Sequence, residues 1–179
     1  MEDEGAFGAT GSPATAAPTV VPSLVDRIGH RGFSGTYPAK LEPSGRLILA
    51  SSFRGAFTGT GRLRPMRERN LMLWTETAFE LAANAYAAAQ KINAAPRARK
   101  AFYASAPQVT IDKQGRLIVP GELRGRVGID EHVVLVGAID AVEIWPLPTY
   151  EAEMASSLTD ADAWLETYDG PSLDGPGGA

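Results

Sequence analysis

One seven-residue pattern occurs twice in this chain, seventy residues apart. Residues 42–48 read Glu-Pro-Ser-Gly-Arg-Leu-Ile, and residues 112–118 read Asp-Lys-Gln-Gly-Arg-Leu-Ile. The match extends without a gap over residues 41–55 and 111–125. A solenoid needs about three or more copies to bury its core, so two copies indicate a different architecture. We therefore expect one pseudo-symmetric domain built from two copies of a small unit.

Each copy has the local chemistry of a strand, a turn and a second strand. In the second copy, the carboxylate of Asp112 can accept backbone N–H bonds within the turn, and Gly115 can supply the positive φ that closes it. Glu42 and Gly45 hold the same positions in the first copy. These four residues are predicted to shape and orient the two turns.

A strand-turn-strand unit is marginally stable in water when it is isolated. The two copies are therefore expected to interlock, which would present Arg46 and Arg116 as a symmetric pair. The elements around the turns indicate an α+β protein with a helix after each copy. The expected elements are strands at 108–111, 133–136 and 142–145, a short helix from Pro120, a helix within 75–95 whose inner stripe is Phe79, Ala82, Tyr86 and Ala89, and a helix after Thr149 with Tyr150 and Met154 inward.

The ends of the chain differ from its centre in composition. The first thirty or so residues are rich in Gly, Ala, Thr and Pro without apolar periodicity, so we expect a disordered extension. The final Gly, Pro and Asp residues predict a disordered tail, preceded by a short helix at 159–168. The predicted organisation is an extension at 1–31, repeats at 33–79 and 105–150, an inter-repeat helix at 75–95, a helical segment at 149–168 and a tail at 169–179.

The formal net charge of −4 conceals an uneven distribution. Residues 31–150 carry 16 Lys and Arg against 10 Asp and Glu, whereas residues 151–179 carry seven acids and no base. A basic centre between acidic ends favours nucleic acid as a partner.

Several kinds of chemistry find no support in the sequence. Cys is absent, and the two His residues are too few for most His-based metal sites, so we expect no metal and no cofactor. No nucleophile-base-acid set and no phosphate-cradling glycine loop occurs, so we do not expect an enzyme or a small-molecule substrate. No apolar run approaches the roughly 20 residues that span a bilayer, so a soluble cytoplasmic protein is expected.

Several segments resemble one bacterial family, most specifically in the second copy. The matching stretches are residues 33–35, 41–47, 111–120, 133–137 and 143–145. Together they resemble the MraZ family of transcriptional regulators. The resemblance implies two SpoVT-AbrB swapped-hairpin units that form one pseudo-two-fold AbrB-like β-barrel, each unit followed by a helix.

The same resemblance implies double-stranded DNA as the partner. Members of the family assemble into homo-oligomeric rings and bind short direct repeats upstream of the division and cell-wall gene cluster, which implies a nucleoid-associated repressor. The family contacts DNA through an acid-x-x-x-Arg motif, matched here by Glu42 with Arg46 and by Asp112 with Arg116.

The motif is physically suited to DNA. A guanidinium at the mouth of a turn can bind two phosphate oxygens or the O6/N7 edge of guanine, while the acid holds turn and arginine in place. Lys113, Lys40 and Arg31 are predicted phosphate contacts by their position and charge. In the alternative interpretation each turn arginine only pairs with the acid of its own turn. Arg54, Arg124 and Arg126 fit a helix surface or a ring interface equally well.

The first copy departs from the family pattern. It has Glu42 where Asp is usual and Pro43 where Lys is common. Its Arg-rich residues 62–69 align with the apolar strand at 133–136, which predicts either a wider basic face or the loss of a regular strand. We therefore place more weight on Arg116 than on Arg46.

A second functional class also fits the sequence. An AbrB-type antitoxin or other protein-binding module could use the acidic C-terminal segment, with Trp164, to wrap a protein partner. The same acids could instead compete with DNA for the basic centre, or simply keep the chain soluble.

Overall fold

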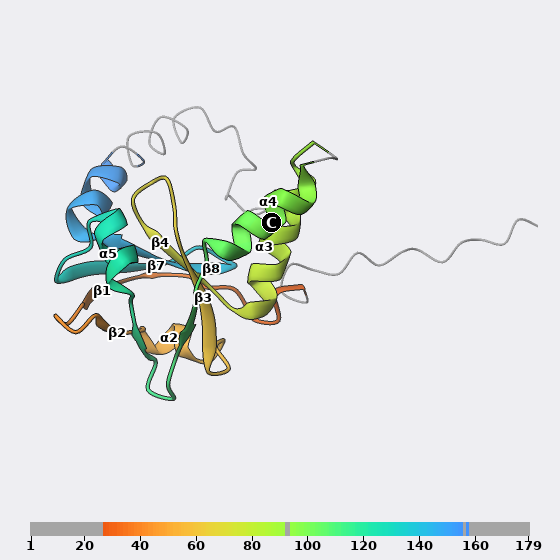
Figure 1. Ribbon diagram of the computed structural model, residues 1–179. Helices are drawn as coiled ribbons and strands as arrows, with labels where there is room; N and C mark the ends of the chain where they lie inside the picture. Colours follow the sequence, from red (N-terminus) through yellow and green to blue (C-terminus); the bar gives the residue numbers. More distant parts are fainter. Residues whose placement is uncertain (1–26, 92–93, 156, 158–179) are drawn as a thin grey trace, which may run out of the picture.

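The computed structural model describes residues 27–91, 94–155 and 157, and it has a mixed α+β architecture (Figure 1). The α+β part of the predicted fold class is thereby confirmed. Residues 147–155 are also helical. The labelled elements are β1 (Thr36–Lys40), β2 (Arg46–Ile48), α2 (Ser51–Arg54), β3 (Thr60–Pro65), β4 (Leu71–Trp74), α3 (Glu76–Ala88), α4 (Ala95–Ala104), β5 (Gln108–Thr110), β6 (Arg116–Ile118), α5 (Gly121–Val127), β7 (His132–Gly137) and β8 (Ala141–Pro146).

The main sheet repeats the internal duplication of the sequence. Its six antiparallel strands have the order β1-β7-β8-β4-β3-β5. The order is symmetric about the β8–β4 pair, because β1 corresponds to β5, β7 to β3 and β8 to β4 in the other copy. β1 of the first copy pairs with β7 of the second, and β5 of the second copy pairs with β3 of the first. Each copy thus gives its first strand to the other, and the expected interlocking is confirmed.

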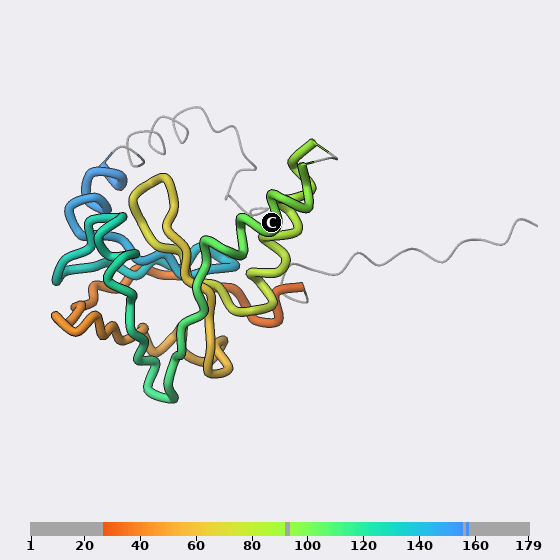
Figure 2. The backbone as a smooth tube through the Cα atoms, in the orientation of Figure 1, coloured from red at the N-terminus to blue at the C-terminus, as the bar shows by residue number. Residues whose placement is uncertain are grey.

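The second sheet is a two-stranded ribbon with one strand from each copy, β2 and β6. Leu47 and Leu117 face each other across the ribbon and are buried. They belong to a core that also contains Leu63 and Leu73 of one copy and Leu135 of the other. The ribbon therefore packs its inner face on the core it shares with the main sheet and turns its outer face to solvent. Figure 2 shows the path of the chain through both sheets.

Helices α3 and α4 form an antiparallel pair that packs on a second, smaller core (Figure 1). The helix predicted within 75–95 is present as α3, which ends at Ala88, and a separate helix that the sequence did not predict, α4, begins at Ala95. Pro96 stands in the first turn of α4, where a missing N–H costs nothing, so it starts a helix instead of only ending one. The buried stripe of α3 is also shifted from the predicted one; it consists of Ala78, Phe79, Ala83 and Ala87.

The Arg-rich segment of the first copy forms a regular strand, β3. Arg62 lies opposite Trp74 in the sheet, as Val134 lies opposite Trp145 in the other copy. The structural counterpart of Arg62 is therefore Val134, within the apolar strand that the sequence alignment placed opposite the Arg-rich segment. Leu63 keeps the inward position, so the predicted loss of the strand does not occur.

The helix predicted after Thr149 is present, and the ring of its Tyr150 lies 6.4 Å from the ring of Trp145. The extension at 1–26, the helix predicted at 159–168 and the tail at 169–179 lie outside the described residues. Within the described residues, no helix is long and apolar enough to cross a membrane.

Candidate nucleic-acid interface

The two turns have the same backbone geometry. The N–H of Glu42 donates to the carbonyl of Arg46 at 2.9 Å, and the N–H of Gly45 donates to the carbonyl of Glu42 at 2.8 Å. The corresponding bonds of the second turn are 3.0 Å and 2.9 Å. Gly45 and Gly115 have φ of 87° and 77°, a conformation that other residues rarely adopt. Both glycines thus have the positive φ that the sequence analysis expected at these positions.

The turns differ in the group that holds the arginine backbone. Asp112 accepts through Oδ1 from the N–H groups of Gln114, at 2.8 Å, and Arg116, at 2.9 Å. The longer Glu42 does not do this. In the first turn Ser44 Oγ accepts from the N–H of Arg46 at 3.4 Å and donates to Glu42 Oε2 at 3.4 Å. Ser44 therefore supplies the short side-chain acceptor that Asp112 supplies in the second copy.

Arg46 and Arg116 stand on the outer face of the β2–β6 ribbon. Arg46 lies opposite Ile118, and Arg116 lies opposite Ile48. The two arginines are therefore diagonal neighbours, and such positions in an antiparallel pair lie about 7–8 Å apart. Both side chains are 50% exposed. They line one open hollow of 420 Å³, together with Thr110, Asp112, Leu117 and Ile118.

Each of these arginines also pairs with the acid of its own turn. Arg46 Nη1 lies 3.5 Å from Glu42 Oε2, and Arg116 Nη1 lies 3.8 Å from Asp112 Oδ2. Exposed ion pairs of this kind contribute about 0–1 kcal/mol to stability, so a ligand anion can replace the acid at small cost. The pairs hold the guanidiniums near the ribbon without occupying all their donors.

A helix of the opposite copy packs beneath each turn. A β-carbon on Gly115 would lie 2.6 Å from Arg54 Cγ, so the arginine of α2 occupies the space that a side chain would need. Arg54 Nε donates to the carbonyl of Leu49 at 2.9 Å, while the N–H of Leu49 donates to the carbonyl of Gly115 at 2.9 Å. Arg54 thereby supports the second turn from within the first copy.

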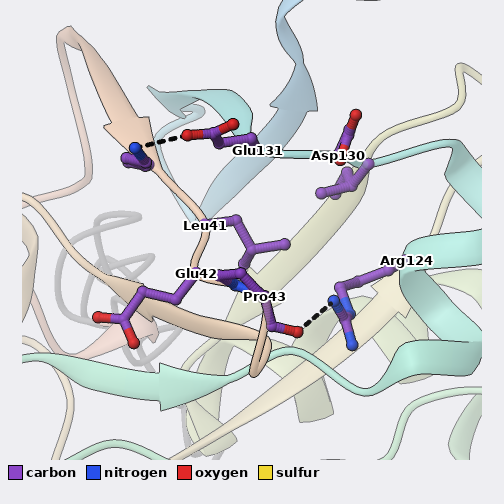
Figure 3. A pocket seen from close by; sticks show the side chains of 8 residues that line it. Leu41, Glu42, Pro43, Arg124, Asp130 and Glu131 are labelled. Carbon is purple, nitrogen blue, oxygen red and sulfur yellow. Dashed lines mark hydrogen bonds and ion pairs between the residues drawn. The ribbon is translucent and has the colours of Figure 1, made fainter.

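Arg124 of α5 has the matching position under the first turn. Its Nη1 donates to the carbonyl of Pro43 at 3.5 Å, across the hollow drawn in Figure 3, and Glu42 points away from it there. A β-carbon on Gly45 would lie 3.4 Å from the guanidinium carbon of Arg124. Of the three arginines that the sequence left between a helix surface and a ring interface, Arg54 and Arg124 thus pack against the turns, whereas Arg126 is exposed.

Two of the three predicted phosphate contacts lie beside the turns. Lys113 is in the second turn and is exposed. Lys40 ends β1 next to the first turn, and its Nζ lies 2.5 Å from Glu131 Oε1 (Figure 3). The hydrogen bond between them raises the pKa of Lys40 and lowers the pKa of Glu131.

Arg31 is not brought to the turns. It precedes the bridge between Phe33 and Ile139, and β1 begins after that bridge and runs away from it. Lys40, at the other end of β1, lies opposite His132. The length of β1 therefore separates Arg31 from the first turn (Figure 1).

Comparisons with known proteins agree on one family. The model of the family described as "MraZ protein, putative antitoxin-like" matches residues 102–164. Proteins named transcriptional regulator MraZ from Salinispora arenicola and Salinispora tropica are each 36% identical, over 72% and 70% of this chain and 91% and 89% of theirs. The one from Thermomicrobium roseum is 30% identical over 79% of this chain and 94% of its own. The chain belongs to the MraZ family of transcriptional regulators.

The arginines of β3 have structural contacts in this MraZ-family chain. Arg62 Nε lies 3.0 Å from Glu76 Oε2. Arg64 Nε donates to Ser105 Oγ at 2.8 Å, and its guanidinium lies 4.5 Å from the centre of the Phe102 ring. Burial lowers the pKa of Arg64. These two side chains fasten α3 and α4 to the sheet, on the face away from the ribbon.

Two residues of the candidate interface were missed in the sequence. Ile48 and Ile118 share the outer face of the ribbon with Arg46 and Arg116 and are 43% and 51% exposed. The sequence contained the signal, because successive side chains of a strand such as Arg-Leu-Ile point to opposite faces. Once its leucine faces the core, its isoleucine must face outward with the arginine.

Proposed function

We propose that this chain is a sequence-specific DNA-binding regulator that contacts duplex DNA through the β2–β6 ribbon and its two turns. The observation that carries the proposal is the placement of Arg46 and Arg116. The two copies of the turn place these two half-exposed guanidiniums at diagonal positions of one ribbon, on the face that is turned to solvent. Each can exchange its weakly held turn acid for a phosphate or for the O6/N7 edge of guanine.

The dimensions of the ribbon support this proposal. The hydrogen bonds from Leu49 to Gly115 and from Val119 to Gly45 extend the pairing to five residues in each strand. At about 3.3 Å per residue the ribbon is about 16 Å long. The major groove of B-DNA, about 12 Å wide, admits a two-stranded ribbon, and the turns at its two ends would then lie near the phosphate backbone.

The charges beside the turns are suited to phosphate. Lys113 is exposed on the second turn, and Lys40 is adjacent to the first. Contacts of this type supply affinity and orientation without sequence information, whereas Arg46 and Arg116 would supply the readout. Arg31, at the far end of β1, could reach only a separate stretch of the backbone.

Two further parts of the proposal, the swapped-hairpin barrel and the repressor role, are supported by the strand exchange and by the family. The exchange of β1 and β5 between the copies supports the AbrB-type swapped-hairpin barrel. Membership of the MraZ family supports a repressor of division and cell-wall genes that binds short direct repeats as a homo-oligomeric ring in the cytoplasm, at the nucleoid. Regulation through a protein partner of the acidic C-terminal segment remains a separate prediction.

Binding of purified variants to DNA tests the proposal. Duplexes selected from a random pool by the full chain serve as the probe, in titrations at several salt concentrations. Arg46→Ala and Arg116→Ala should each weaken binding by about 1–3 kcal/mol, and Arg97→Ala, which removes an exposed charge from α4, should not. Unchanged affinity in both ribbon variants, with the fold intact by circular dichroism, would show that DNA does not bind here.

A further inference from the structure

We infer that Ile48 and Ile118 contact the 5-methyl groups of thymine and thereby make the ribbon select A·T pairs beside the bases that the arginines read. The inference rests on the proposed DNA-binding function of the ribbon. It adds a second kind of base contact, apolar and not ionic, made by residues outside the acid-x-x-x-Arg motif.

The exposure of these isoleucines is a property of both copies. Residues 41–50 and 111–120 have the same sequence of buried and exposed positions, with the isoleucine exposed in each. Ile48 is 43% exposed and Ile118 is 51% exposed, and the described residues contain two other large apolar side chains with comparable exposure, Tyr86 and Ile139. An apolar side chain held in water twice, at equivalent positions of one surface, indicates a ligand that covers it.

The arrangement places each isoleucine beside an arginine of the other strand. Arg46 lies opposite Ile118, and Ile48 lies opposite Arg116. The four side chains form one patch in which like residues are diagonal neighbours. The charges indicate what covers the patch, because an apolar protein surface would have to desolvate both guanidiniums, whereas DNA offers them phosphates and guanine edges.

The chemistry of the major groove selects the base. Guanine, adenine and cytosine present hydrogen-bonding groups at their major-groove edge, and thymine adds an apolar methyl group. An isoleucine side chain has no donor or acceptor to offer the polar groups, but it can bury itself against the methyl. A ribbon with this patch therefore favours sites in which guanines and thymines are interleaved.

Replacement of thymine by deoxyuridine isolates the methyl group. Duplexes selected from a random pool by the full chain would be resynthesised with deoxyuridine at one thymine at a time. At one or two positions the affinity should fall about fourfold, the factor that corresponds to ~0.8 kcal/mol for one buried CH₂. The Ile48→Ala/Ile118→Ala variant should bind the thymine and deoxyuridine duplexes equally at those positions.

A matched variant and two further outcomes complete the test. Ile139→Ala removes an isoleucine that is 59% exposed but lies away from the ribbon, and it should keep the preference for thymine. If Arg46→Ala and Arg116→Ala weaken binding but no deoxyuridine does, the DNA-binding proposal stands and this inference is overturned. It is also overturned if the double isoleucine variant changes the sedimentation mass while the preference for thymine persists, since the patch would then join copies of the chain.

Discussion

Arg54 of the first copy fills the space beside Gly115 of the second, with its Cγ only 2.6 Å from where a β-carbon of Gly115 would lie. Arg124 packs beside Gly45 in the same way but less closely, since its guanidinium carbon lies 3.4 Å from where a β-carbon of Gly45 would lie. Each turn that carries a ribbon arginine is thus supported by a helix of the other copy. The duplication does more than present two similar contacts, because it makes the shape of each turn depend on the partner copy.

Gly115→Ala should lower the free energy of unfolding substantially. A φ of 77° costs an ordinary residue about 1–2 kcal/mol, and the new methyl group would also displace Arg54. Urea denaturation of the purified variant measures the effect. Gly55→Ala is the matched control, because Gly55 has a φ of −64° and open space around it, and we expect it to keep or slightly raise the stability. Equal stability of the two variants would contradict the steric role of Gly115.

Arg124→Ala should loosen the first turn without unfolding the domain. The variant loses the bond to the Pro43 carbonyl and the packing beside Gly45. We expect faster amide hydrogen exchange at Gly45 and Val119, measured by NMR, with little change elsewhere. Arg126→Ala, an exposed arginine on the same helix, should leave exchange at the turn unchanged. Similar exchange in both variants would mean that Arg124 does not support the turn.

The features that the sequence predicted correctly are those determined by local chemistry. The turns could be predicted because an acid and a glycine at this fixed spacing restrict the backbone to a few turn conformations. The contacts of Arg54 and Arg64 could not, because their partners, Gly115 and Ser105, lie far away in the chain. The register of β3 could not be predicted either. A gap in an alignment can be placed in several ways, and only the pairing of Arg62 with Trp74 shows which side chains face the core.

Arg64→Ala should reduce stability and leave DNA binding unchanged. The substitution removes the bond to Ser105 Oγ and the stacking on Phe102, so we expect a loss of about 1–2 kcal/mol in urea denaturation. Arg67→Ala, at an exposed position just after β3, should cost almost nothing. Weaker DNA binding by Arg64→Ala, measured below its unfolding transition, would instead support a basic face that includes β3.

Lys40→Ala should raise the pKa of Glu131 toward its ordinary value. In the folded protein the hydrogen bond and the charge of Lys40 hold that pKa low, so the pair contributes stability at neutral pH that is lost as the pH falls below about 4.3. NMR titration of the Glu131 side chain measures the shift in both proteins. An unchanged titration curve would show that the ion pair does not persist in solution.

Glu131→Gln should make DNA binding stronger and more sensitive to salt. Without its carboxylate partner, Lys40 is free to contact a phosphate, and each such contact steepens the dependence of log K on log salt by about 0.9. Glu80→Gln removes the same charge from an exposed site on α3, away from the ribbon, and controls for the change in net charge. Titrations at several salt concentrations give both slopes. Lys40→Ala added to Glu131→Gln should return the slope to the wild-type value, and a steep slope that survives in this double variant would assign the extra phosphate contact to another residue.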